Sequence, residues 1–220
     1  MSRPHFRAVI FDMDGVIADS EPTYLEAINA VLAPHGVRMT PQQYDEVIGT
    51  SVHHTWQIVL GTFGIDGDVE EYVRAYDGTL IELLRRPLPP LPGVRGLLAE
   101  LRRRRLAVAL CSSSWKAWVE ALLEATGMDS AFDAVVWREM AARSKPAPDL
   151  YLKAAELILM PPARCLALED TGPGIEAAKA AGMFAVQVRA ASTALPPIEA
   201  ADLVLDSLER FPLEMLGQPD

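Results

Sequence analysis

The sequence of 220 residues has little cysteine and no long apolar run. Its two cysteines, Cys111 and Cys165, lie within or at the end of apolar strand-like runs. This excludes a disulfide framework and favours a reducing, cytoplasmic setting. No apolar stretch approaches the roughly 20 residues that a membrane-spanning helix needs. The polar segment Met1–Arg7 does not resemble a secretion signal. We therefore expect a protein without disulfides, signal peptide or membrane span.

Positive charge is also scarce. The sequence has 20 Lys and Arg residues and 30 Asp and Glu residues, which gives a net charge of −10. Such an acidic chain argues against a nucleic-acid or anionic-membrane partner. The basic run Arg102–Arg105 falls at the end of a predicted helix, where cations favour the helix dipole. Internal repeats and low-complexity segments are absent, and half of the residues are apolar. One large domain, or a core with a smaller insert, is therefore expected. The oligomeric state is left open, with a monomer as one option.

The pattern of apolar residues changes along the chain. A short run, Ala8-Val9-Ile10, predicts a first buried strand, and residues 17–86 then follow helical periodicity throughout. A stiff, proline-rich connector precedes strict alternation of helices and strands from Val94 onward. This alternation predicts an α/β fold, a Rossmann-like doubly wound parallel sheet with helices on both faces. The expected division is a catalytic core of residues 1–16 and 88–220, with residues 17–87 inserted as an α-helical cap that acts as a lid.

Polar side chains follow the predicted strands where each one ends. Asp12 and Asp14 follow the first strand, and residues two apart on a strand would point the same way. The other groups at strand ends are Ser112, Ser113, Ser114, Lys145, Glu169, Asp170 and Thr171. Taken singly, each could be a helix cap, a turn or an exposed residue. Together they predict a site, because ligands of open parallel sheets bind outside the carboxyl ends of the strands.

The chemistry that suits these side chains is phosphoryl transfer. Several carboxylates without nitrogen or sulfur partners form a hard oxygen site, which favours Mg²⁺ over zinc. Lysine, serine hydroxyls and helix-start amides can neutralise the transferred phosphoryl group. One aspartate can act as the nucleophile, and a second acid can protonate the leaving oxygen and then activate water.

The motifs resemble those of the haloacid dehalogenase-like superfamily, in its phosphatase and β-phosphoglucomutase branch with a helical cap. The resemblance covers essentially the whole chain. Its four motifs are Phe11-Asp12-Met13-Asp14-Gly15-Val16, Ser112, Lys145 within Ser-Lys-Pro-Ala-Pro-Asp, and Leu168-Glu169-Asp170-Thr171-Gly172-Pro173-Gly174. The resemblance implies a nucleophile, Asp12, and a general acid/base, Asp14. It also implies two sets of ligands, one for the phosphoryl oxygens and one for Mg²⁺. In the second set, Glu169 would bind the ion either directly or through water. The phosphate ligands are Ser112, Ser113 and Lys145, and the metal ligands are Asp12, Asp14 through its carbonyl, Glu169 and Asp170.

The resemblance leaves two reactions open, hydrolysis of a small phosphomonoester such as a sugar phosphate and transfer within a hexose phosphate. Mutases of this branch carry a histidine in the hinge and an arginine in the first cap loop. This chain has Tyr24 and Val52 at those positions, so we favour the phosphatase. A non-catalytic binding protein on the same fold is a remote third option, because the motif residues are intact. The cap residues expected to select the substrate are Glu21, Gly49, Thr50, Ser51 and His53.

Overall fold

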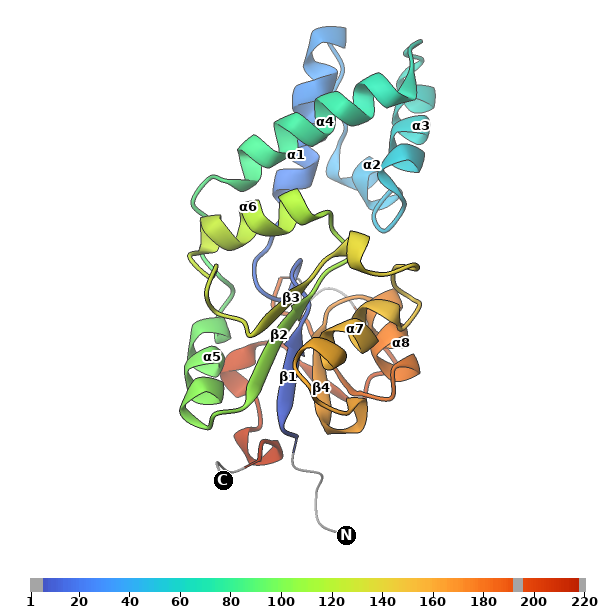
Figure 1. The fold of residues 1–220 in the computed structure, drawn as a ribbon. Helices are drawn as coiled ribbons and strands as arrows, with labels where there is room; N and C mark the ends of the chain where they lie inside the picture. Colours follow the sequence, from blue (N-terminus) through green and yellow to red (C-terminus); the bar gives the residue numbers. More distant parts are fainter. Residues whose placement is uncertain (1–5, 192–195, 218–220) are drawn as a thin grey trace. The chain divides into compact units, whose positions relative to one another are not determined.

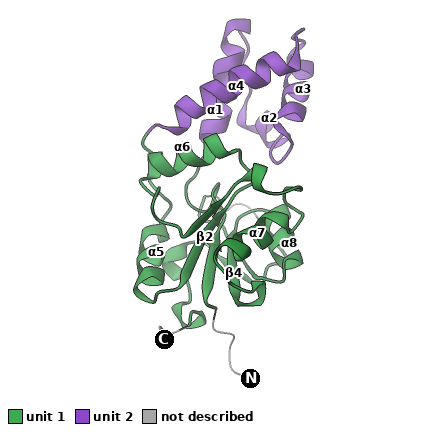
Figure 2. Cartoon of the chain, in the orientation of Figure 1, with its two compact units in different colours: residues 1–19, 87–220 green, residues 20–86 purple. Residues whose placement is uncertain are grey.

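The fold was analysed in a computed structural model, which describes residues 6–191 and 196–217. The chain divides into two compact units (Figure 2). One consists of residues 1–19 and 87–220, and the other of residues 20–86.

The larger unit is built on a parallel sheet (Figure 1). Within the described residues it has six strands in the order β3-β2-β1-β4-β5-β6. The strands are β1 (Ala8–Phe11), β2 (Ala107–Cys111), β3 (Ala134–Val136), β4 (Cys165–Glu169), β5 (Phe184–Val188) and β6 (Leu203–Leu205). Every pairing between neighbouring strands is parallel. This order confirms the predicted doubly wound α/β fold and places β1 between β2 and β4.

Helices cover both faces of this sheet. They are α5 (Val94–Arg103), α6 (Lys116–Thr126), α7 (Asp149–Leu157) and α8 (Gly172–Ala180). Figure 1 shows α7 and α8 on one side of the strands and α5 on the other. Successive side chains of β1 point to opposite faces of the sheet, so the strand is buried on both faces. Ala8 and Ile10 join the core cluster that contains residues of α7 and α8, while Phe11 packs edge-on against Phe132. Short 3-10 turns complete the unit, η2 (Arg138–Met140), η3 (Pro162–Arg164), η4 (Leu208–Arg210) and η5 (Leu213–Met215).

The smaller unit is helical. Its elements are α1 (Glu21–Leu32), η1 (Ala33–His35), α2 (Pro41–Asp45), α3 (Val52–Phe63) and α4 (Val69–Leu84). Trp56, fully buried, stacks on Tyr72 and meets Tyr76 edge-on, so aromatic rings form part of its core. The periodicity predicts a helix from residue 41 to near Gly49, which is wrong, because α2 ends at Asp45. The hydrogen bond from Val47 N–H to the Tyr44 carbonyl spans only three residues, so the chain tightens into turns there.

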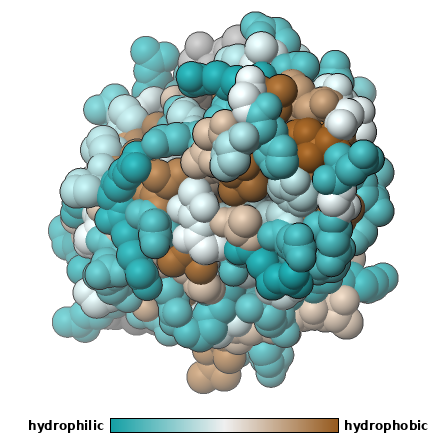
Figure 3. All heavy atoms as spheres, turned by 90° about the horizontal axis from the view of Figure 1, so that it is seen from above, coloured by the Kyte–Doolittle hydropathy of each residue, from teal (hydrophilic) through white to brown (hydrophobic). Residues whose placement is uncertain are grey.

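The surface agrees with the acidic composition. On the face shown in Figure 3, hydrophilic groups predominate and apolar groups lie between them in separate patches. Among the described residues, no helix combines the length and apolar character needed to cross a bilayer.

One exposed leucine gives a stability prediction. Leu159 follows α7, and its backbone has the left-handed φ of +53°, which is strained for a residue with a side chain. The residue is 90% exposed, so burial of the side chain does not offset this strain. We expect Leu159→Gly to stabilise the protein by about 0.5–1 kcal/mol, because glycine adopts this conformation without strain. Thermal unfolding measures the effect. The matched control, Leu152→Gly, changes a 43% exposed leucine within α7 and should destabilise by about 1 kcal/mol. A lower melting temperature for Leu159→Gly would contradict the strain argument.

Candidate active site

Three strands deliver the central residues of the site to one edge of the sheet. Phe11 is in register with Leu110 of β2 and Leu168 of β4, so the residues that follow them lie side by side. Asp12 continues this register, because its N–H donates to the Leu168 carbonyl at 2.8 Å. The Asp12 side chain is therefore held at the carboxyl end of the central strand.

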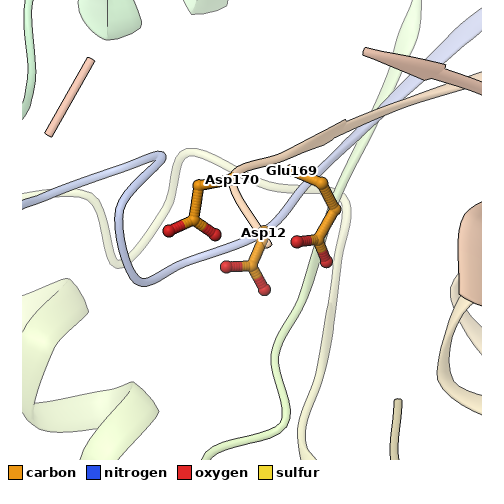
Figure 4. A group of neighbouring side chains, drawn as sticks. All are labelled: Asp12, Glu169 and Asp170. Carbon is orange, nitrogen blue, oxygen red and sulfur yellow. The ribbon is translucent and has the colours of Figure 1, made fainter. Parts of the chain in front are cut away.

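Three carboxylates converge at this edge. Asp12, Glu169 and Asp170 each place an oxygen so that all three atoms lie within 4.8 Å of one another. Figure 4 shows the three side chains directed into a common space from β1 and β4. Asp12 is 7% exposed and Glu169 is 1% exposed, so water screens their charges poorly.

Lys145 supplies the positive charge of the cluster. Its Nζ donates to Asp12 Oδ1 at 2.5 Å, to the Cys111 carbonyl at 3.0 Å and to Glu169 Oε1. Its side chain is 7% exposed. One ammonium thus joins the ends of β1, β2 and β4.

The pKa values of the acids are raised in spite of this ammonium. Burial and the nearby Glu169 raise the pKa of Asp12 from 3.8 to about 8, although Lys145 opposes the shift. Burial, Asp12 and Glu169 likewise raise the pKa of Asp170 well above its usual value. Burial disfavours the ammonium form of Lys145, but Asp12 and Glu169 outweigh it and raise the lysine pKa. In the absence of a metal ion, burial and mutual repulsion therefore favour the protonated forms of Asp12 and Asp170.

A divalent cation fits the cluster on two observations. The donors are carboxylate oxygens, which suit a hard ion such as Mg²⁺. In addition, Asp170 Oδ1 is buried and has no hydrogen-bond partner among the described residues. Gly15, at φ +73°, keeps space for this carboxylate, since a Cβ there would lie 2.1 Å from Asp170 Oδ2. Any side chain at position 15 would thus displace Asp170.

Asp14 occupies a separate position. The strand ends at Phe11, and the Gly15 N–H bonds to the Ala18 carbonyl, so the chain turns at Asp14. The half-buried Asp14 is not among the three carboxylates that converge; its Oδ2 accepts a hydrogen bond from Ser114 Oγ at 3.1 Å. Because β1 ends at Phe11, the strand alternation expected for Asp12 and Asp14 does not apply to them, although Asp14 still helps to raise the pKa of Asp12.

Serines lie on the loop after β2 and on the loop that carries Lys145. Ser112 is 1% exposed, and its N–H donates to the Val136 carbonyl. Its Oγ accepts from the Ser114 N–H at 3.0 Å. Ser144 Oγ donates to Ser113 Oγ at 2.9 Å, which links the loop before Lys145 to the loop after β2. The predicted phosphate ligands thus lie on two connected loops of the larger unit.

The motifs do not reveal Tyr151. This fully buried residue of α7 donates its hydroxyl to Glu169 Oε1 at 2.8 Å, and its ring lies 5.0 Å from Lys145 Nζ. Thr171 Oγ1 donates to Glu169 Oε2 at 3.2 Å. The one available sequence signal is a phenol on the apolar face of the helix that follows Lys145. Tyr151 and Thr171 together hold the Glu169 carboxylate.

Gly174 offers a test of how tightly Glu169 is held. A Cβ at position 174 would lie 1.9 Å from Glu169 Oε2, so Gly174→Ala must displace the carboxylate. We expect about 1–3 kcal/mol lower stability from the overpacking, and an activity at least about tenfold lower because the cluster shifts. Phosphate-release kinetics and thermal unfolding measure the two effects. Gly172→Ala is the matched control, since a Cβ there meets nothing within 4 Å. Equal behaviour of the two variants would contradict a rigidly held Glu169.

Comparison with known proteins identifies the family. A family model described as haloacid dehalogenase-like hydrolase matches residues 9–188. The chain is a haloacid dehalogenase-like hydrolase. This confirms the family that the four motifs indicated.

Several relatives of this hydrolase are characterised. Fructose-1-phosphate phosphatase YqaB of Escherichia coli is 37% identical over 84% of this chain and 97% of its own. Beta-phosphoglucomutase of Bacillus subtilis is 32% identical over 96% of this chain and 94% of its own. CbbY from Rhodobacter sphaeroides, solved in complex with phosphate, has a TM-score of 0.83 at 26% identity, with 96% of this chain and 99% of that chain covered. The branch thus includes both a phosphatase and a mutase.

The predicted substrate-selecting residues all belong to the smaller unit. Glu21 Oε2 accepts from the Tyr44 hydroxyl at 2.6 Å, and Thr50 Oγ1 is 2.7 Å from Thr55 Oγ1. Ser51 caps α3 by accepting from the His54 N–H, and Gly49 has φ +81°. His53 Nε2 lies 3.3 Å from Glu70 Oε1 in an exposed pair. Their part in substrate selection remains a prediction.

Proposed function

We propose that this hydrolase is a Mg²⁺-dependent phosphomonoesterase that acts on a small phosphorylated metabolite, such as a sugar phosphate. The observation that carries the proposal is the buried cluster in which Lys145 bridges Asp12 and Glu169, while Asp170 Oδ1 beside them has no hydrogen-bond partner in the described part of the chain. Such a cluster combines a nucleophile, a cation and space for a metal, which are the parts that phosphoryl transfer requires.

The Mg²⁺ would be held by Asp12, Asp170 and the Asp14 backbone carbonyl. The Glu169 oxygens already accept from Lys145, Tyr151 and Thr171, so Glu169 would hold the ion directly or through water. When bound, Mg²⁺ supplies positive charge that offsets the repulsion among the acids and the charge on the phosphoryl oxygens.

The reaction takes place in two steps carried out by the chain's own carboxyl groups. In the first, an Asp12 oxygen bonds to phosphorus, the ester P–O bond breaks, and the leaving oxygen takes a proton from Asp14. In the second, water attacks the phosphorus of the aspartyl-phosphate and gives its proton to Asp14. The P–O bond to Asp12 then breaks and releases inorganic phosphate, so both carboxyl groups return to their initial state.

The surrounding polar groups hold the phosphoryl oxygens during both steps. Lys145 remains charged because its pKa is raised, and it therefore attracts the phosphoryl group while it orients Asp12. Ser112 and Ser113 contribute hydroxyl and backbone donors from the loop after β2. Cys111 and Cys165 are buried and free, which accords with a reducing compartment such as the cytoplasm.

Residues 20–86 would act as a lid that selects the ester and excludes bulk water. Glu21, Gly49, Thr50, Ser51 and His53 are the proposed selecting residues. The substrate class is supported by the phosphatase relative that acts on fructose 1-phosphate and by the mutase relative, both enzymes of phosphorylated carbohydrates. Mutase activity is the second candidate because of that relative; Tyr24 and Val52, at the mutase histidine and arginine positions, favour water as the acceptor.

Phosphate release across a panel of phosphomonoesters, with and without Mg²⁺, tests this function. Fructose 1-phosphate and other sugar phosphates should release phosphate only with the metal. A second assay offers β-glucose 1-phosphate with a trace of hexose bisphosphate. Interconversion of hexose phosphates without net phosphate release would replace the phosphatase with the mutase. Absence of both activities would favour a binding protein.

A further inference from the structure

Ser114 lies against the proposed acid, outside the set of predicted phosphate ligands. Its Oγ donates to Asp14 Oδ2 at 3.1 Å, which joins the loop after β2 to the turn after β1. The two residues are 100 positions apart in the sequence. Both side chains are half-buried, so this hydrogen bond is only partly exposed to competition from water.

The backbone of Ser114 is fixed on both sides. Its N–H donates to Ser112 Oγ at 3.0 Å, and its carbonyl accepts from the Arg138 N–H at 3.0 Å. The hydroxyl is therefore presented by a loop that is fastened to β2 and to η2.

Asp14 has a different support. It lies in the turn that Gly15 makes at φ +73°, just before the segment that leads into the smaller unit. Lys145 donates to Asp12 and Glu169, whereas the Asp14 carboxylate accepts from Ser114. A carboxyl that must meet a leaving oxygen benefits from a restraint on its rotamer, because misorientation lowers proton-transfer rates.

We propose that Ser114 is a positioning residue, whose hydroxyl orients the Asp14 carboxyl for proton transfer to the leaving oxygen. The proposal rests on the proposed function, in which Asp14 is the general acid. In this proposal Ser114 acts through Asp14, whereas Ser112, Ser113 and Lys145 bind the phosphate.

Leaving-group dependence separates this role from a structural one. An aryl phosphate such as p-nitrophenyl phosphate expels its phenolate with little need of a proton, whereas a sugar phosphate expels an alkoxide and needs one. We expect Ser114→Ala to lower kcat/KM, which reports the step that expels the leaving group, about tenfold for a sugar phosphate, a fraction of what a general acid contributes, and less than about twofold for the aryl phosphate. Ser114→Thr keeps the hydroxyl and should restore most of the rate.

Three further variants make the result decisive. Asp14→Asn should show the same substrate dependence more strongly, and Ser114→Ala should add little to it in the double variant, because the two residues act as a unit. Ser130→Ala is the matched control and should leave both rates unchanged, because Ser130 lines a pocket with residues at the start of β2, whereas the site lies at the carboxyl ends of the strands. Thermal unfolding of each variant verifies that the fold is kept.

The outcomes separate the two proposals. Equal losses of kcat/KM on both substrates would overturn the positioning role and indicate phosphate binding or structural support instead. If Asp14→Asn shows the leaving-group dependence and Ser114→Ala does not, only the role of Ser114 is wrong. If Asp14→Asn itself lacks the dependence, the proposed general acid is wrong and Ser114 has no acid to position.

Discussion

Asp12→Asn should abolish metal-dependent phosphate release, with kcat at least about 10³-fold lower, as for other enzymes that lose their nucleophile. The amide cannot form an aspartyl-phosphate, and it provides one fewer anionic oxygen for the metal. Release of p-nitrophenol and of inorganic phosphate, measured at saturating Mg²⁺, gives the effect. Retained activity would contradict the assignment of Asp12 as the nucleophile.

The same substitution should stabilise the metal-free protein. Burial and Glu169 raise the pKa of Asp12 to about 8, so the folded state binds a proton that the unfolded state, near 3.8, releases. Wild-type stability therefore decreases as pH rises from about 4 to about 8. Asparagine resembles the neutral acid and removes this contribution, so its advantage should grow across that window and reach at least about 1 kcal/mol, the value of one pKa unit.

Thermal unfolding in EDTA at several pH values measures this gain, with Asp129→Asn as the control. Asp129 is exposed, so the same chemical change there should leave the pH dependence of wild type intact. A destabilised Asp12→Asn at pH 8 would show that Lys145 outweighs burial and Glu169 at this carboxylate. The expected pairing of higher stability with lost activity is typical of residues selected for catalysis.

The strands and their polar ends were predictable from the sequence for a simple physical reason. Buried parallel strands need short apolar runs, such as Ala8-Val9-Ile10, and their carboxyl ends lie at one edge of the sheet. Asp12, Lys145, Glu169 and Asp170 could thus be assigned to one place, although they are far apart in the chain. The helix expected to end near Gly49 failed because periodicity does not reveal where hydrogen bonds shorten into turns.

The second set of residues in the site could not be predicted in the same way. Tyr151 lies on a helix face that is apolar by pattern, and nothing local shows that its hydroxyl reaches Glu169. Likewise, the Ser114–Asp14 bond depends on how a loop after β2 and a turn after β1 pack in three dimensions. Side-chain hydrogen bonds between loops are set by tertiary geometry, whereas strand order follows from rules that a sequence pattern expresses.

Lys145→Met should produce the second large effect, because it removes the ammonium that bridges Asp12 and Glu169. Methionine fills a similar volume, so the change isolates the charge. Without metal, we expect about 3–5 kcal/mol lower stability at pH 8, the usual result of removing one partner from a buried ion pair. We expect kcat/KM to be about 10²–10³-fold lower, since a preorganised donor to the phosphoryl oxygens is lost.

The response to Mg²⁺ distinguishes the two roles of this lysine. A divalent cation neutralises the same carboxylates, so saturating Mg²⁺ should recover part of the lost stability, whereas the rate should stay low because the donor to phosphate is still missing. The control is Lys153→Met, which removes a lysine of α7 that pairs with the exposed Glu156 at 3.1 Å. Its stability and rate should remain near wild type, because exposed pairs contribute little.

Unchanged stability of Lys145→Met in EDTA would mean that the acids accept protons in place of the ammonium. In that case protonation, which the raised pKa values of Asp12 and Asp170 favour, would be what keeps the metal-free cluster folded.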